Sequence, residues 1–459
     1  MKPYPSLTGL ADAYTNGETT PAEVTDAHLA RIAALDPEIG AYQAVHADTA
    51  REAADAATKA IHSGHRIGPF HGIPFALKDI CELEGQVTTA GSAAWADRVS
   101  SHTGTVARRL IQAGGILLGK TKTVEFAYGG WGTNQRMGTP KNPWDLATHR
   151  APGGSSSGSG AAVAAGLAVC AVGTDTGGSV RIPAAFCGIT GLKTTEGQVP
   201  TDGIIPLSHT LDTPGPLARS VADALVMYEV MAGREAHLTA RDLVDGAGRF
   251  AVLTEGVMGL RLGTLTDAER EACTPEVLAG YDAACARLGG LGAHLAPFDM
   301  PTPFARTASK IGRLMSAEAW YHHQTLYGDP DAPMDEDVRP RMLFGEKISA
   351  AEYLGILDAR RAEQARMAQA MSGLDAILTP TATRTAPPLD EINQGVSPAH
   401  FTRTFNYLAM CGLSVPTGLA ADGLPTSLQI ACRGGDEYLA LRIGAALEAA
   451  QGSPPNPAL

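Results

Sequence analysis

The sequence predicts an α/β fold in which helices cover one large, mostly buried β-sheet. Helical and strand-like segments alternate along most of the 459 residues, and this alternation is typical of a sheet packed between helices. Hydrophobic residues make up 44% of the chain and charged residues 18%, which is the composition of a globular protein. Because no internal repeat and no charged or proline-rich linker divides the chain, we expect one domain over residues 1–459.

Six segments outside the glycine-rich centre have helical patterns. The first has the clearest start, because Thr20 and Glu23 match a capping box and Pro21 stands at the first helical position. The second is rich in alanine and ends at a glycine, which is a common helix stop. We predict helices over residues 18–39, 48–64, 103–115, 220–233, 274–290 and 349–373.

Four short apolar segments predict buried strands, and the first of them, GIPFALKDI, contains one lysine, Lys78. In the glycine-rich centre, the small apolar residues of 161–175 change from a helical to a strand-like pattern. We predict strands over residues 72–80, 114–121, 259–267 and 374–382.

Charge and cysteine content narrow the function classes. A net charge of −12 argues against a broad phosphate-binding surface, so nucleic acid is not an expected partner. We expect no secretory signal, and the longest nearly apolar run, residues 161–173, is too short for a bilayer, which needs ~20 residues. The seven cysteines are scattered without a C-x-x-C pair, which is typical of reduced thiols. We therefore expect a cytoplasmic protein without a membrane partner.

Two short motifs match known sites but stand in the wrong context. Residues 114–121 fit the phosphate-binding pattern G-x-x-x-x-G-K-T, yet a helix precedes them and their interior, GILL, is strand-like. Residues 154–158 fit the nucleophile elbow G-x-S-x-G, yet a polar loop precedes them where an elbow needs a strand. His322 and His323 are interpreted as a partly exposed helical pair. Because the histidines show no metal-binding spacing, we expect no metal site and no cofactor.

Two glycine-rich segments could build an active site. In residues 151–166, APGGSSSGSGAAVAAG, serines precede a packed helix, where backbone N–H groups are free and positive. In residues 173–183, GTDTGGSVRIP, Gly177 and Gly178 allow successive N–H groups to converge beside the hydroxyl of Ser179. Acyl transfer requires such a nucleophile with donors for the developing oxyanion.

A serine nucleophile also requires a base, and no histidine stands near either segment in a suggestive context. Lys78 is the candidate, because burial in an apolar strand disfavours its charge and lowers its pKa. The residues alone equally allow Lys78 to pair with Asp79 or another carboxylate. Asp175 and Arg181 flank the serine and could form an ion pair that braces its loop.

Four separated motifs, GIPFALKD, APGGSSSGSGAAVAAG, GTDTGGSVRIPAAFCGITGLK and LDTPGPLARSVAD, together resemble the amidase signature family. The resemblance also includes GILLGKTKTVEFAYG and LSVPTGLAADGLPTSLQIACR. It runs in order from about residue 20 to residue 445, with the signature core at about 69–235. It implies a single large mixed sheet wrapped by helices, and an amidase that cleaves linear amide C–N bonds.

The resemblance also implies the roles of individual residues in a Ser–cis-Ser–Lys triad. By position, Ser179 matches the nucleophile, Ser155 matches the bridging serine with the cis peptide, and Lys78 matches the base. The matching oxyanion hole consists of the N–H groups of Thr176, Gly177, Gly178 and Ser179.

One segment bears on the type of amidase. IIPLSHTLDTPGP is closer to the free-standing members than to the glutamine-hydrolysing A subunit of the tRNA-dependent amidotransferase, which typically reads SSLDQIGP. That subunit is the first alternative, and a catalytically inactive binding or scaffold protein on the same fold is the second. A homodimer is left open.

The substrate pocket is expected around EFAYGGWGTN. Ala127, Tyr128 and Trp131 lie where family members line the pocket, although the two aromatic residues could equally belong to the core. Because Arg181 is assigned a structural role, no fixed cation for a carboxylate is evident. The expected substrate is therefore a small neutral amide, hydrazide or ureide that releases ammonia or an amine.

Overall fold

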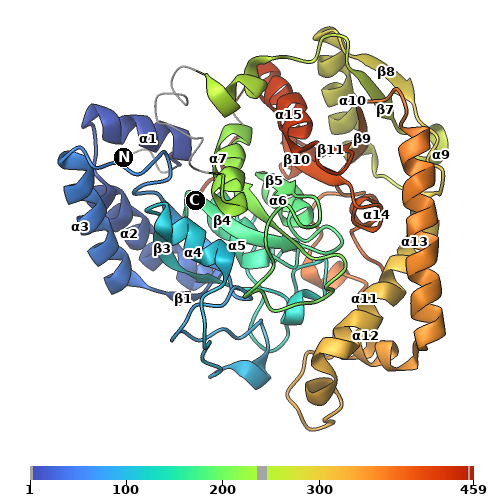
Figure 1. The fold of residues 1–459 in the computed structure, drawn as a ribbon, viewed down its shortest axis with the longest axis horizontal. Coiled ribbons are helices and arrows are strands. Elements are labelled where there is room, and N and C mark those ends of the chain that lie inside the picture. The colour runs from blue at the N-terminus through green and yellow to red at the C-terminus, as the bar shows by residue number, and fades with distance from the viewer. Residues whose placement is uncertain (1–3, 235–245, 453–454) are drawn as a thin grey trace.

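The computed structural model describes residues 4–234, 246–452 and 455–459, and an eleven-stranded β-sheet forms its centre (Figure 1). The strands are β1 (Tyr42–Val45), β2 (Pro74–Lys78), β3 (Ile116–Thr121), β4 (Cys170–Asp175), β5 (Thr190–Lys193), β6 (Thr213–Ala218), β7 (Arg261–Thr264), β8 (His294–Pro297), β9 (Ala376–Pro380), β10 (Cys411–Leu419) and β11 (Pro425–Cys432). Their order in the sheet is β1-β3-β2-β4-β6-β5-β10-β11-β9-β7-β8.

The sheet is mixed, as the resemblance to the amidase signature family implies. Strand β2 runs parallel to both β3 and β4, and β7 runs parallel to both β8 and β9. The strands between these two groups pair in antiparallel fashion, from β4 through β6, β5, β10 and β11 to β9. Helices pack around the sheet over its whole width (Figure 1). The predicted α/β class is therefore confirmed.

The helices include all six predicted ones, with ends that differ by a few residues. At the first, Thr20 Oγ1 accepts from the N–H of Glu23 and the Glu23 carboxylate accepts from the N–H of Thr20, so the predicted capping box is present. The helices are α1 (Leu7–Asn16), α2 (Pro21–Ile39), α3 (Ala47–His62), α4 (Thr105–Gln112), α5 (Ser157–Ala164), α6 (Arg181–Cys187), α7 (Val221–Ala232), α9 (Asp267–Arg270), α10 (Pro275–Gly290), α11 (Phe304–Tyr327), α12 (Arg339–Phe344), α13 (Ala350–Ala370), α14 (Thr402–Tyr407) and α15 (Glu437–Gln451).

The small residues of α5 allow it to lie in the buried interior of the molecule. Every residue of α5 and of β4 is buried. A Cβ atom added at Gly158 would lie 2.2 Å from the carbonyl oxygen of Ala41 and 2.5 Å from the N–H nitrogen of Lys122. Because only glycine fits this contact, α5 packs closely against the neighbouring segments. The serines that precede α5 therefore lie deep in the interior.

The two misleading motifs have structural roles. Lys120, the lysine of the phosphate-loop pattern, is buried in β3, where its Nζ lies 2.9 Å from Asp79 Oδ1. The sequence left open an ion pair between Lys78 and Asp79. In the structure, the partner of Asp79 is Lys120 and not Lys78. Ser156, the serine of the elbow pattern, donates its hydroxyl to the carbonyl oxygen of Thr174 at 3.3 Å and accepts from its N–H.

One sequence interpretation on α11 was wrong. His322 and His323 are not both partly exposed, because His323 is buried and its ring packs against Phe126 with centroids 4.2 Å apart. Burial lowers the pKa of His323 to about 4, so this side chain is neutral near pH 7.

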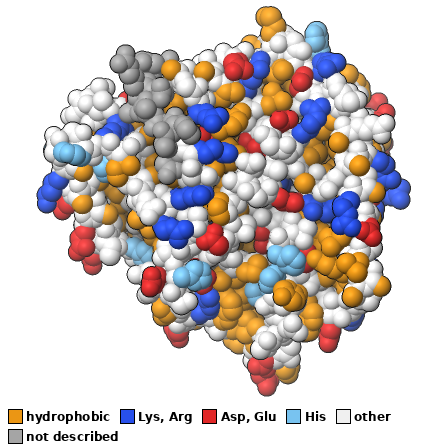
Figure 2. All heavy atoms as spheres, in the orientation of Figure 1, with side chains coloured by type: hydrophobic (Ala, Val, Ile, Leu, Met, Phe, Trp, Pro, Cys, Tyr) orange, Lys and Arg blue, Asp and Glu red, His pale blue; other side chains and the backbone are white. Residues whose placement is uncertain are grey.

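The surface carries charges of both signs. On the face shown in Figure 2, basic side chains stand among acidic and apolar ones. Within the described residues, no helix is both long enough and apolar enough to cross a lipid bilayer.

Candidate active site

Lys78 ends strand β2 and points its amine at two hydroxyl groups. Its side chain is completely buried, and Nζ lies 2.7 Å from Ser155 Oγ and 2.8 Å from Thr174 Oγ1. Burial lowers the pKa of Lys78 to about 7, although the charges of Cys81, Asp212 and Asp175 act in the opposite direction. A large fraction of this amine is therefore neutral near pH 7 and able to accept a proton.

Ser155 lies in the tight turn that leads into α5. The peptide bond between Gly154 and Ser155 is cis. The carbonyl oxygen of Ser155 accepts hydrogen bonds from Thr123 Oγ1 at 2.9 Å and from the N–H of Val124 at 3.2 Å. A Cβ at Gly154 would lie 2.6 Å from the backbone nitrogen of Gly132, so the turn has no room for a side chain before the serine.

Ser179 lies on the loop between β4 and α6, beside the serine turn. The N–H of Ser156 donates to the carbonyl oxygen of Ser179 at 3.3 Å, which joins the two glycine-rich segments. Gly178 has φ of 134°, and a Cβ there would lie 2.3 Å from Thr402 Oγ1. The loop conformation therefore requires glycine immediately before the serine. Within the described residues, Ser179 Oγ makes no hydrogen bond, so the hydroxyl is available to a ligand.

The backbone N–H groups of this loop differ in one respect from the sequence expectation. In the described part of the chain, the N–H groups of Thr176, Gly177 and Ser179 have no hydrogen-bond acceptor. The N–H of Gly178 instead donates to Asp175 Oδ1 at 2.7 Å, so it is already occupied. Of the four N–H groups expected to form an oxyanion hole, three are therefore free in this structure, and the loop uses the fourth to hold its own shape.

Asp175 and Arg181 form a completely buried, bidentate ion pair at the base of the loop. Arg181 Nη2 lies 2.9 Å from Asp175 Oδ1, and Nε lies 2.9 Å from Oδ2. Burial alone would raise the pKa of Asp175, but the adjacent guanidinium outweighs it and holds the pKa well below its usual range. Asn406 on α14 and Gln429 on β11 bind the same cluster. Segments far apart in sequence therefore fix this loop.

We predict that Arg181→Met lowers the free energy of unfolding by ~3–5 kcal/mol, because it leaves the Asp175 carboxylate buried without its partner. Urea denaturation measures the change. The control is Arg51→Met, which breaks the exposed pair between Arg51 and Asp26 and should change stability by ~1 kcal/mol or less. Equal losses in the two variants would contradict the bracing role.

Sequence reasoning missed two polar residues of the site. Thr174 supplies the second hydroxyl on Lys78, and Asp212 accepts the hydroxyl of Thr176. Asp212 also accepts from the N–H of Leu207 at 2.8 Å and of Ser208 at 2.9 Å, and burial raises its pKa to about 6. Asp212 stands in the LDTPGP motif and Thr174 five residues before Ser179, but their spacing alone does not reveal which atoms meet.

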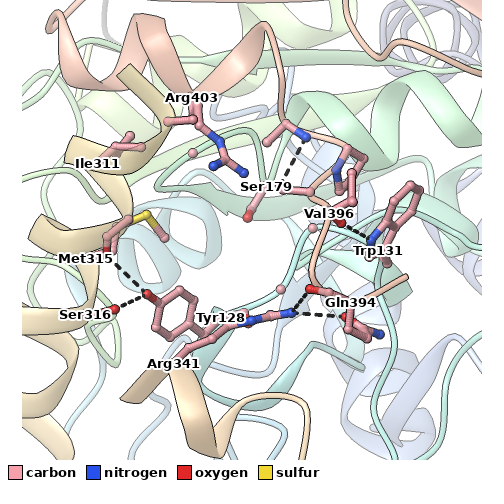
Figure 3. A pocket seen from close by; sticks show the side chains of 18 of the residues that line it. Tyr128, Trp131, Ser179, Ile311, Met315, Ser316, Arg341, Gln394, Val396 and Arg403 are labelled. Carbon is pink, nitrogen blue, oxygen red and sulfur yellow. Dashed lines mark hydrogen bonds between the residues drawn. The ribbon is translucent and has the colours of Figure 1, made fainter. Parts of the chain in front are cut away.

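A cavity of about 540 Å³ opens over Ser179 (Figure 3). Ala127, Tyr128 and Trp131 line it, as does Gly177. The Tyr128 hydroxyl lies 2.8 Å from Ser316 Oγ, and Trp131 Nε1 donates to the carbonyl oxygen of Val396 at 2.8 Å. The structure thus brings the three residues of the expected pocket to the candidate nucleophile.

The cavity wall also includes positively charged side chains that the sequence analysis did not identify. Arg313, Arg341 and Arg403 line it, and they come from α11, α12 and α14. The expectation that no fixed cation faces the substrate was therefore wrong. The physical reason is that these arginines belong to C-terminal helices that fold back over Ser179, and no spacing rule connects them to it.

Comparisons with known proteins agree with this geometry. A family model described as Amidase matches residues 23–441. The chain is 34% identical to the 2-amino-5-chloromuconic acid deaminase of Comamonas testosteroni, over 90% of this chain and 89% of the relative. It is 35% identical to the A subunit of the glutamyl-tRNA(Gln) amidotransferase of Roseiflexus sp. (strain RS-1), over 96% of each chain.

Solved structures give the same answer. The native peptide amidase from Stenotrophomonas maltophilia superposes with a TM-score of 0.83 at 28% identity, over 99% of this chain and 98% of that one. A crystal structure described as amidase superposes with a TM-score of 0.86 at 30% identity, over 98% and 100%. Because the family model and the relatives cover nearly the whole sequence, this chain belongs to the amidase family and is a hydrolase of amide C–N bonds.

Proposed function

We propose that this amidase is a free-standing enzyme that cleaves a small carboxylic amide, or a related hydrazide or ureide, through an acyl-enzyme on Ser179. The observation that carries the proposal is the contact of Lys78 Nζ with Ser155 Oγ, both completely buried, next to the Ser179 loop. It supplies a base of suitable pKa and a hydroxyl through which a proton can pass.

The proposed mechanism begins with proton transfer from Ser179. Neutral Lys78 takes a proton from Ser155 as Ser155 takes one from Ser179, whose oxygen then attacks the amide carbonyl carbon. Ser179 Oγ turns toward Ser155 in this step, since catalytic hydrogen bonds often tighten only when substrate is bound. The free N–H groups of Thr176, Gly177 and Ser179 stabilise the resulting oxyanion.

Breakdown of the tetrahedral intermediate reverses the proton path. Protonated Lys78 returns a proton through Ser155 to the leaving nitrogen, the C–N bond breaks, and ammonia or an amine departs. Water then attacks the acyl-enzyme with the same relay as base and releases the acid.

We predict that Ser155→Ala lowers kcat by ~10²–10⁴-fold, because it removes the link in the proton path. The matched control is Ser157→Ala in the same serine run, since Ser157 Oγ has only a 3.5 Å contact with the carbonyl oxygen of Lys122. Steady-state release of ammonia measures both variants, and equal rates for the two would contradict the relay.

The first test of the function is a panel of amides, hydrazides and ureides assayed with the isolated chain. The alternative of an amidotransferase subunit gains support if glutamine is the only productive substrate and hydrolysis requires partner chains. The inactive-scaffold alternative gains support if a fluorophosphonate probe fails to label Ser179. A free-standing amidase requires turnover by the chain alone together with labelling.

The proposal extends to the organisation of the whole chain. One amidase domain over 1–459, with its core at about 69–235, is supported by a single sheet that takes strands from both ends of the chain. A cytoplasmic location is supported by seven free cysteines. Freedom from nucleic-acid and membrane partners, and a homodimeric assembly, stay predictions from the sequence.

A further inference from the structure

The three arginines of the cavity differ in how their charges are compensated. Arg313 forms an ion pair with Glu352 and stacks over Phe344, so its charge has a partner. Arg341 donates to the carbonyl oxygen of Tyr128 at 2.8 Å and to that of Gln394 at 2.9 Å, which fixes the wall of the cavity. Among the described residues, Arg403 has neither a carboxylate partner nor a side-chain hydrogen bond. Its charge is therefore available to a ligand.

Arg403 points into the cavity from the side of α14 and faces the region of Ser179 (Figure 3). Burial lowers the pKa of its guanidinium, Tyr128 opposes that shift, and nearby Arg341 adds to it. A cation that is both partly desolvated and close to another cation is unfavourable in the empty site, and an anion bound between them would relieve this cost.

The position of Arg403 relative to the nucleophile is fixed by its neighbours. Thr402 Oγ1 donates to the carbonyl oxygen of Gly177 at 2.8 Å, and the carbonyl oxygen of Thr402 accepts from Arg181 at 3.0 Å. A Cβ built on Gly177 would lie 3.6 Å from the Cβ of Arg403, so the arginine lies directly against the nucleophile loop. A ligand whose carbonyl lies at Ser179 can therefore also reach the side chain of Arg403.

The rest of the cavity wall offers no negatively charged partner for an ammonium group of a ligand. Within the described residues, the cavity wall contains three arginines and no aspartate or glutamate. Ile311 and Met315 supply apolar surface near Arg403, which suits methylene groups between two polar ends (Figure 3). An ammonium group in this cavity would lose its hydration without gaining a carboxylate partner.

We propose that the substrate is an amide that carries a carboxylate but no ammonium group, with the carboxylate bound by Arg403. This inference rests on the proposed function, because it places the reacting carbonyl at Ser179. It also separates this enzyme from a glutaminase, since L-glutamine carries an α-ammonium group for which the described cavity wall offers no carboxylate partner.

The test uses three primary amides that differ only at the far end. Glutaramate has the carboxylate alone, L-glutamine has the carboxylate and the ammonium, and pentanamide has neither. We expect kcat/KM for glutaramate to exceed that for either other amide by ~10-fold or more, the range of hydrogen bonds to charged groups. Equal or better hydrolysis of pentanamide or glutamine would overturn the proposal.

Arg403→Gln should lower kcat/KM for glutaramate by ~10–100-fold and that for pentanamide by less than ~3-fold. The matched control is the double variant Arg313→Gln with Glu352→Gln, which removes a cavity arginine together with its counter-charge. It should keep the preference for glutaramate within ~3-fold. Equal losses on both substrates in Arg403→Gln would show that Arg403 only supports the fold, and would overturn its role.

A binding measurement separates this inference from the proposed function. Glutarate titrated calorimetrically into Ser179→Ala tests the anion site without turnover, and Arg403→Gln added to that background should weaken binding by ~10-fold or more. Binding that is absent, or unaffected by Arg403→Gln, would overturn the anion site. Loss of all amide hydrolysis with Arg403-dependent glutarate binding retained would instead refute the proposed function alone.

Discussion

Replacing Ser179 by alanine should abolish turnover, with kcat falling by up to ~10⁶-fold, as for other serine nucleophiles. Ser179 is the hydroxyl that lies in the cavity on the same loop as three unoccupied N–H groups, whereas the neighbouring hydroxyl of Thr176 is already donated to Asp212. Within the described residues no group depends on Ser179 Oγ for a hydrogen bond. The variant should therefore fold with an unchanged melting temperature.

The control for this variant is Ser397→Ala, a second serine of the cavity wall. Ser397 Oγ accepts from the N–H of Ala399 at 3.2 Å, so its removal tests the loss of a hydroxyl at the cavity without the loss of a nucleophile. Ammonia release and fluorophosphonate labelling should both vanish in Ser179→Ala and persist in Ser397→Ala. Turnover of Ser179→Ala within tenfold of the wild type would remove Ser179 from the mechanism.

Local sequence signals predicted the elements whose causes are local. The capping box at Thr20 and the apolar run around Lys78 each indicate an element without reference to the rest of the chain. Of helix α11 (Phe304–Tyr327), only the pair His322 and His323 was interpreted as helical, and the hairpin of β10 and β11 was not predicted. The hairpin is buried along most of its length, and such strands show no apolar and polar alternation by which to recognise them.

The candidate site divides in the same way. Lys78, Ser155 and Ser179 stand in motifs from which their catalytic roles can be predicted. The structure brings Lys78 and Ser155 into contact. Arg403 has no such motif, because its place in the cavity results from the packing of α14 on the Gly177 loop through Thr402. Contacts between residues more than 200 positions apart are a property of the tertiary fold and carry no local pattern.

The activity should rise with pH through about 7, because Lys78 acts as a base only when its amine is neutral. Its pKa of about 7 in the folded protein lies well below the usual value of a lysine because the side chain is completely buried. Below this pH the amine is protonated and cannot accept the proton of Ser155, whereas above it the rate should level off. Lys78→Ala should lose this acidic limb together with ~10²–10⁴-fold in rate, and an amide with an activated leaving group should lose less.

The matched control is Lys193→Met, which removes another fully buried lysine with a lowered pKa. Burial lowers the pKa of Lys193 to about 8, but its Nζ donates to the carbonyl oxygens of Thr194 and Met410, both at 2.8 Å, so its role is structural. This variant should lose stability and keep the acidic limb near pH 7. Loss of the limb in Lys193→Met, or its persistence in Lys78→Ala, would rule out Lys78 as the base.

The melting temperature of Lys78→Met tests independently whether Lys78 is a buried base or part of a structural ion pair, because the two roles predict changes of opposite sign. A lysine whose pKa is lower in the folded state than in the unfolded state binds fewer protons when folded. Its burial therefore disfavours folding most below about pH 7, and this penalty shrinks as pH rises toward the unfolded pKa of ~10.4. Lys78→Met removes the penalty, so its melting temperature at about pH 6 should equal or exceed that of the wild type. If Lys78 instead held a structural ion pair, the same variant would melt lower and keep the wild-type shape of the pH profile.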